Sequence, residues 1–95
     1  MNRPDNTHIF QQVTAYMNDL YKRKNTAYGD SFSRSVQKYG LIAALTRISD
    51  KFNRLETLLL NPNIAHNDEK VSDTLLDLAS YCVMTLMEMD KDNNK

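Results

Sequence analysis

The sequence has little of several residue types, and each shortage excludes a class of protein. One cysteine among 95 residues, Cys82, excludes an intramolecular disulfide and a thiolate metal cluster. Two glycines are too few for the Gly-rich phosphate loops of the Walker and Rossmann kinds. With only two prolines besides, the chain allows few tight turns. The composition therefore favours long helices over many short strands.

An excess of charge and a long apolar run are also missing. Twelve Lys and Arg residues balance twelve Asp and Glu residues, so the chain has no overall field that would draw it to duplex nucleic acid or to an anionic membrane. No apolar stretch is long enough for a signal peptide or a membrane span. We therefore expect a cytoplasmic protein with no membrane or duplex nucleic acid partner, in which any anion site is local.

Apolar residues at helical spacing predict four helices, over about 7–25, 32–39, 41–60 and 69–89. Gly29 lies in a predicted loop over 25–31, and Pro62 lies in a predicted turn over 61–68. Because that turn joins the two long helices, we expect them to run antiparallel. The predicted fold is all-α, a compact bundle of about four helices forming one domain over 1–95, with frayed tails at 1–5 and 90–95.

The two long helices carry more apolar surface than one chain can cover. In the third helix, steps of four and three residues join Leu41, Leu45, Ile48, Phe52, Leu55 and Leu59 into one seam. The fourth helix has one stripe of Val71, Leu75, Leu78, Cys82 and Met89, and another of Leu76, Ala79, Val83, Leu86 and Met87. Because an exposed stripe of this size invites aggregation, we expect a second copy to cover it, giving a homo-oligomer. Cys82 is expected to be a buried structural thiol.

The first candidate site lies on the third helix, where Arg47, Lys51 and Arg54 share one face. Three cations in a row can clamp phosphates. Asp50 lies among them, so the alternative is a solvated face with weak ion pairs.

The second candidate is the acidic start of the fourth helix, with Asp68, Glu69, Asp73 and Asp77. Carboxylates one turn apart can hold Mg²⁺, and a metal site here would use Asp50, Asp73 and Asp77. Alternatively, the first three carboxylates complement the positive end of the helix dipole. Asp77 lies within an apolar run and needs a cation, which Lys51 or Arg54 can supply across the bundle.

The third candidate is the predicted loop at Tyr28, Gly29, Asp30, Ser31 and Phe32. Tyr28 or Phe32 can stack on a base, and Ser31 can bond a sugar or phosphate near the amides that open the next helix. The alternative is a helix start capped by Asp30 or Ser31, with the aromatic residues in the core.

Four blocks carry a family resemblance: KNTAYGDSF at 24–32, YGL at 39–41, RISDKFNRL at 47–55 and DTLLDLASY at 73–81. With them the chain resembles the nucleotide modification associated domain family, first type. The resemblance implies a small helical module of phages and bacteria, linked to nucleotide or modified-base metabolism. It also implies function at the three candidate sites, where these blocks fall. For a phage protein, the expected location is the host cytoplasm.

The helical layout is also faintly similar to MazG-type and dimeric dUTPase-like pyrophosphohydrolases, which hold Mg²⁺ with clustered carboxylates. That group typically places several Glu on the first helix and a Glu-x-x-Asp on the second, whereas here Asp50 stands with Lys51 and Arg54, and Thr74 occupies the place three residues before Asp77. Two metals would therefore lack ligands. We therefore expect a protein that binds a nucleotide without processing it and without a cofactor, as in a sponge that sequesters a host immune signalling nucleotide. The alternatives are a divergent Mg²⁺-dependent pyrophosphohydrolase and a protein-partner module.

Overall fold

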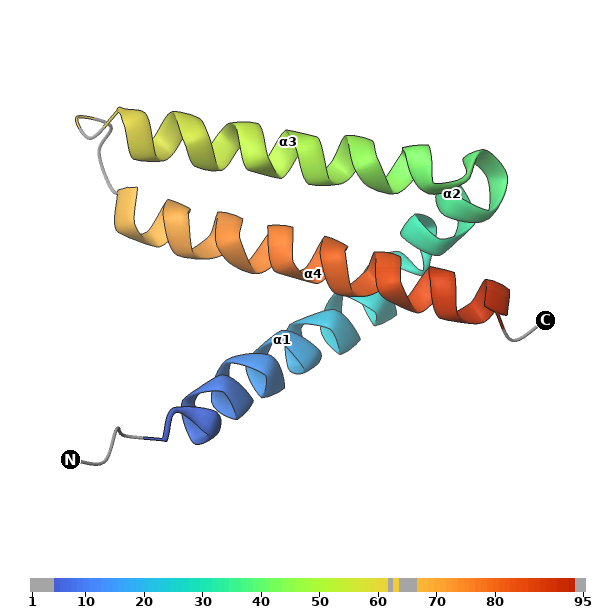
Figure 1. The fold of residues 1–95 in the computed structure, drawn as a ribbon, viewed down its shortest axis with the longest axis horizontal. Coiled ribbons are helices and arrows are strands. Elements are labelled where there is room, and N and C mark those ends of the chain that lie inside the picture. The colour runs from blue at the N-terminus through green and yellow to red at the C-terminus, as the bar shows by residue number, and fades with distance from the viewer. Residues whose placement is uncertain (1–4, 62, 64–66, 94–95) are drawn as a thin grey trace.

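The computed structural model describes residues 5–61, 63 and 67–93. Four helices make up nearly all of this part of the chain, and no strand occurs within it (Figure 1). They are α1 (Thr7–Tyr28), α2 (Ser31–Tyr39), α3 (Leu41–Leu60) and α4 (Asn67–Asn93). The all-α prediction is confirmed. Of the predicted turn at 61–68, residues 62 and 64–66, His66 among them, lie outside the described residues.

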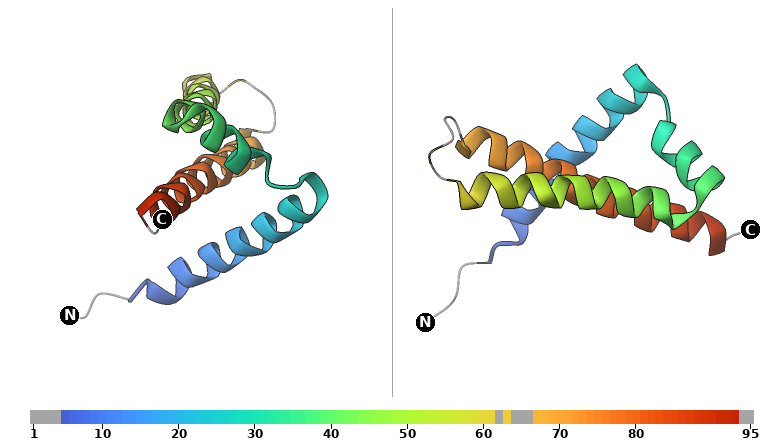
Figure 2. Two further views of the ribbon diagram at one scale, coloured as in Figure 1. Left: turned by 90° about the vertical axis from the view of Figure 1, so that its right-hand side faces the viewer. Right: turned by 90° about the horizontal axis from the view of Figure 1, so that it is seen from above.

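The long helices α3 and α4 form an antiparallel hairpin, as the sequence predicted (Figures 1 and 2). Buried residues are spaced along both helices: Ala44 and Leu58 on α3, and Thr74 and Glu88 on α4. Seen end-on, α2 and the end of α1 lie on one side of this hairpin (Figure 2). The hairpin is therefore the scaffold on which the other two helices are placed.

A small core fixes α2 against the open end of the hairpin. Phe32 and Val36 are one turn apart on α2, and both pack with Ala44 of α3. Tyr81 and Met84 of α4 cover this cluster from the other helix. In contrast, the N-terminal half of α1 extends away from the hairpin (Figure 1). Its apolar residues, such as Phe10 at 72% exposure, are therefore open to solvent in the single chain.

Two helices run past their predicted ends. The first continues to Tyr28, so that only Gly29 and Asp30 separate α1 from α2. Gly29 ends it with φ of 70°, a conformation that side chains disfavour, and donates its N–H to the Asn25 carbonyl at 2.9 Å. The last helix continues to Asn93 instead of fraying after Met89, because Lys91 bonds to Glu88 and Ser33.

A second apolar face of the hairpin is exposed, and we name it the outer face. It consists of Leu41, Leu45, Phe52 and Leu59 of α3 and Leu75, Cys82, Leu86 and Met89 of α4. The prediction of a buried Cys82 is therefore wrong for the single chain, because its stripe of α4 is turned away from α3. Within the described residues, none of the helices is apolar enough over a sufficient length to cross a bilayer.

Candidate functional site

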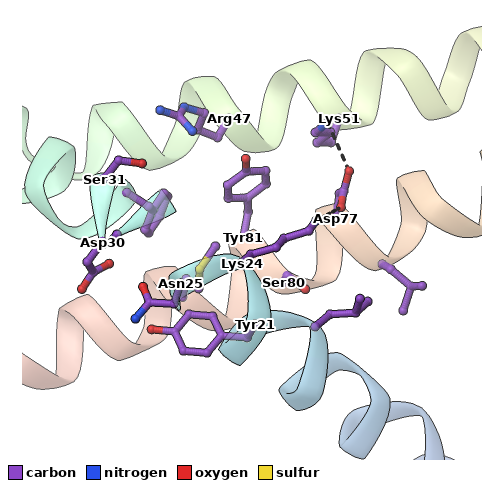
Figure 3. Close-up of a pocket in the computed structure, with 15 residues that line it drawn as sticks. Tyr21, Lys24, Asn25, Asp30, Ser31, Arg47, Lys51, Asp77, Ser80 and Tyr81 are labelled. Atoms are coloured by element: carbon purple, nitrogen blue, oxygen red, sulfur yellow. Dashed lines mark hydrogen bonds and ion pairs between the residues drawn. The ribbon is translucent and has the colours of Figure 1, made fainter. Parts of the chain in front are cut away.

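A cavity of about 300 Å³ lies where the end of α1 meets α2, α3 and α4 (Figure 3). Gly29 makes the sharp exit from α1 that brings Asp30 and the first turn of α2 beside the hairpin. The cavity is lined by Leu20, Tyr21, Lys24 and Asn25 of α1, Gly29 and Asp30 of the link, Ser31 and Phe32 of α2, Arg47 and Lys51 of α3, and Leu76, Asp77, Ser80, Tyr81 and Met84 of α4. Residues from all four helices therefore line this cavity.

Two lysines and one carboxylate meet at one end of the cavity. Asp77 accepts an ion pair from Lys51 Nζ at 3.2 Å and another from Lys24 Nζ at 3.4 Å. The predicted pairing of Asp77 with Lys51 is confirmed, and Lys24 of α1 joins it. The Lys51 side chain is 30% exposed, whereas that of Lys24 is 61% exposed. Lys51 is therefore the better desolvated of the two donors.

An aromatic wall adjoins these cations. The Arg47 guanidinium lies over the Tyr81 ring, with Cζ 6.0 Å from its centroid. The Tyr81 ring in turn contacts Phe32 at 5.6 Å between centroids, with the rings tilted by 38°. Phe32 is only 7% exposed, so its ring is mainly a core residue that supports Tyr81. Tyr21 of α1 lines the same cavity and lies beside Asn25 (Figure 3).

Two polar side chains, those of Asp30 and Asn25, lie at the edge of the cavity near the α1–α2 link. Asp30 holds the N-cap position of α2, but its side chain makes no capping hydrogen bond. The capping bond predicted as an alternative for Asp30 is therefore absent, whereas at the start of α1 the Asp5 carboxylate accepts a hydrogen bond from the amide of Thr7. The Asp30 carboxylate and the Asn25 amide remain available on the cavity edge (Figure 3).

Seven of the ten residues predicted for the site line this cavity: Gly29, Asp30, Ser31, Phe32, Arg47, Lys51 and Asp77. Asp50 and Arg54 do not line it, because both are exposed on α3 away from the cavity. These two residues therefore lie on a solvated face, as the alternative predicted, but neither forms an ion pair in the described part of the chain. Tyr28 ends α1, and its side chain lies outside the described part.

The carboxylates proposed for a metal are not brought together. Among the described residues, no three His, Cys, Asp or Glu side chains form a group suited to a metal ion, so Asp50, Asp73 and Asp77 are not one cluster. The nearest charged partners of Asp77 are instead two lysines. The side chains of Asp68 and Glu69 lie outside the described part.

About half of the residues that line the cavity were not predicted from the sequence. Asp77, Ser80, Tyr81 and Met84 follow at i, i+3, i+4 and i+7, which places them on one face of α4. That mixed polar and aromatic spacing was readable from the sequence. The α1 contribution, chiefly Lys24, was not, because it depends on the angle at which α1 leaves α2.

Comparison with known proteins gives one finding. A family model described as nucleotide modification associated domain 1 matches residues 24–89. This span begins at Lys24 and includes every residue of the cavity except Leu20 and Tyr21. No curated protein and no solved structure matches the chain.

Proposed function

This chain belongs to the nucleotide modification associated domain 1 family, and from that premise we propose that it binds a nucleotide in the cavity without processing it. The observation that carries the proposal is the pairing of a cationic end with an aromatic wall in one cavity. A nucleotide has the same two parts, an anionic phosphate and a flat base.

In this proposal the phosphate binds beside Lys24, Lys51 and Arg47. Each lysine ammonium has three donors, and the ion pair to Asp77 uses one of them. The remaining donors are available to phosphate oxygens, as are the donors of Arg47, whose fork suits them. Because Asp77 already holds both lysines, little side-chain entropy is lost when the phosphate arrives. Asp77 thus orients the cations instead of contacting the ligand.

The base belongs against the aromatic wall. Tyr81 and Tyr21 supply aromatic faces on which a base can stack. In proteins that bind single-stranded nucleic acids, such stacking contributes about 1–3 kcal/mol per base, measured by alanine substitution. Asn25 and Asp30 lie at the adjoining edge, where an amide and a carboxylate can bond to the polar edge of a base or to a ribose hydroxyl. A volume of about 300 Å³ is at the lower end of ligand pockets, which suits a single nucleotide.

Binding without processing follows from how the charge is neutralised. The two lysines and Arg47 meet the phosphate charge directly, so the site needs no metal for recognition. A protein of this kind withdraws its ligand from solution in proportion to its own concentration. Sequestration of a signalling nucleotide made by a host during antiviral defence is the biological use we propose for a phage-encoded copy.

The test is thermal unfolding of the purified protein with a panel of nucleoside mono-, di- and triphosphates, cyclic nucleotides and ADP-ribose. A ligand that binds the native state raises the unfolding temperature. Arg47→Met and Lys51→Met should each remove most of that rise. Arg54→Met is the matched control, because Arg54 is two turns from Arg47 on the same helix but lies outside the cavity.

Chromatography of the recovered ligand separates binding from catalysis. Intact ligand after prolonged incubation supports the proposal. Loss of ligand that requires Mg²⁺ and is abolished by Asp77→Asn would indicate the pyrophosphohydrolase alternative instead. Equal losses of stabilisation in Arg47→Met and Arg54→Met would reject this cavity as the site.

A further inference from the structure

The outer face of the α3–α4 hairpin carries exposed apolar residues from both helices. Two of its α3 residues follow directly after buried residues, as Leu45 follows Ala44 and Leu59 follows Leu58. On α4, Leu75 follows buried Thr74 in the same way. One residue is a rotation of about 100° around a helix. Because α3 and α4 are antiparallel, the same rotation on both turns these residues to the same side of the hairpin.

This side is opposite to the cavity. Residues of the cavity such as Asp77 and Met84 are rotated from the buried line of α4 in the other direction. The end-on view agrees, since α2 and the end of α1 lie together on one side of the hairpin (Figure 2). Within the described chain, no helix covers the outer face, and Leu45, Phe52 and Leu86 are 58%, 53% and 64% exposed there.

The solvent-accessible surface of the chain is large for its mass. The chain exposes 7620 Å², whereas a folded monomer of 11.0 kDa exposes about 5,600 Å². The excess is larger than the about 800 Å² per partner that a standard protein interface buries. The exposed apolar residues of the outer face contribute to this excess, together with those of the N-terminal half of α1.

The spacing on the outer face identifies the partner. On α4, the steps from Leu75 to Cys82, Leu86 and Met89 are seven, four and three residues, which is the repeat of knobs-into-holes packing. On α3, Leu45, Phe52 and Leu59 are seven residues apart. Two antiparallel helices with such seams complement a second identical pair, because back-to-back hairpins make a four-helix bundle.

We propose that the outer face binds a second copy of this chain, so that two α3–α4 hairpins form a four-helix bundle with the two cavities on its outside. The inference rests on the apolar surface and not on the proposed nucleotide site. Its failure would therefore leave the nucleotide proposal standing, and the converse also holds.

The experiment measures the solution mass of the full chain by sedimentation over a hundredfold range of concentration. The expected result is a dimer at micromolar concentration, with Phe52→Lys raising the dissociation constant by at least 100-fold. Phe10→Lys is the matched control, since it makes the same substitution at an exposed phenylalanine of α1 outside the outer face. Far-UV circular dichroism checks that both variants keep their helices.

Cys82 gives a second readout, because it is the one cysteine of the chain and lies on the outer face. In the dimer its thiol should react slowly with a disulfide reagent, and in Phe52→Lys at least 10-fold faster. A monomeric mass at every concentration would overturn the proposal. So would an unchanged mass in a folded Phe52→Lys protein, or a loss of dimer in Phe10→Lys as large as in Phe52→Lys.

Discussion

Replacing Glu88 with alanine should remove the hydrogen bond between α2 and α4 and lower the free energy of unfolding by a large fraction. Glu88 is 7% exposed and accepts two hydrogen bonds, from Ser33 Oγ at 2.7 Å and from Lys91 Nζ at 2.6 Å. Ser33 is itself 5% exposed and lies beside Phe32 on α2. This contact therefore ties the helix that carries the cavity edge to the long hairpin.

The magnitude follows from the hydrogen bonds that would be lost. Ser33 Oγ already accepts from Gln37 at 3.2 Å and from Lys91 at 3.3 Å, so only Glu88 takes its hydroxyl proton among the bonds described. Removing the carboxylate leaves a buried donor unmet, at about 1–3 kcal/mol, and also removes a bond between charged groups. A total of about 2–4 kcal/mol corresponds to a fall in Tm of about 10 °C or more.

The same group predicts a dependence on pH. The hydrogen bond from Lys91 lowers the pKa of Glu88 below its ordinary value, against the opposing effect of burial, and the bond from Ser33 adds to the lowering. The unfolded chain then binds the proton more readily than the folded one, so this contribution is complete above about pH 4.3. It is lost as pH falls through the lower pKa of the folded state.

Urea unfolding at pH 7 and at stepwise lower pH provides the assay, with protein concentration held constant. Glu88→Ala should be destabilised at pH 7, and the parent protein should approach the stability of Glu88→Gln only as the pH falls through the lowered pKa of Glu88. Asp90→Ala is the matched control, because it removes an exposed carboxylate two residues further along α4. A change of less than 0.5 kcal/mol in Glu88→Ala, on the order of an ordinary surface substitution, would refute the reasoning.

Three further predictions concern single positions. Gly29→Ala should lower stability by about 1–2 kcal/mol in urea, because Gly29 has φ of 70°. Ala44→Leu should cost about 1–3 kcal/mol in the same assay, since Ala44 is 1% exposed within the core and overpacking forces its neighbours aside. Asp77→Asn should cost less than about 1 kcal/mol at pH 7, because its ion pairs to Lys24 and Lys51 are partly exposed; a larger loss would mean that the pairs hold α1 to the hairpin.

The helices were predictable from periodicity, but their ends were less so. The chain around Asn25 lost its apolar pattern, and the predicted helix stopped there, yet α1 continues to Tyr28 until Gly29 turns the backbone. The polar composition around Lys91 predicts a frayed tail after Met89, but α4 continues to Asn93, where Lys91 bonds to Glu88 and Ser33. In both cases a contact or a backbone angle outweighed the local composition.

The candidate site was predictable where it depends on one helix and not where it depends on several. Arg47, Lys51 and Arg54 share a face of α3 in any isolated helix, so the sequence treats them alike. The cavity includes the first two and leaves out Arg54, because α1 and α2 cover only the half of the hairpin nearer to α2. Lys24 lines the site for the same reason, and it lies on α1, whose position relative to the hairpin the sequence does not determine.

By itself, the sequence determined the all-α class, the antiparallel pairing of α3 and α4 and the need of Asp77 for a cation, because spacing along a helix and short turns are local properties. Only the tertiary structure decided which cations reach Asp77, that Phe32 supports Tyr81 from within the core, and that Cys82 lies on an exposed face. These depend on the angles between helices. Such angles are set by how side chains from different helices fit together, which a pattern along one helix does not contain.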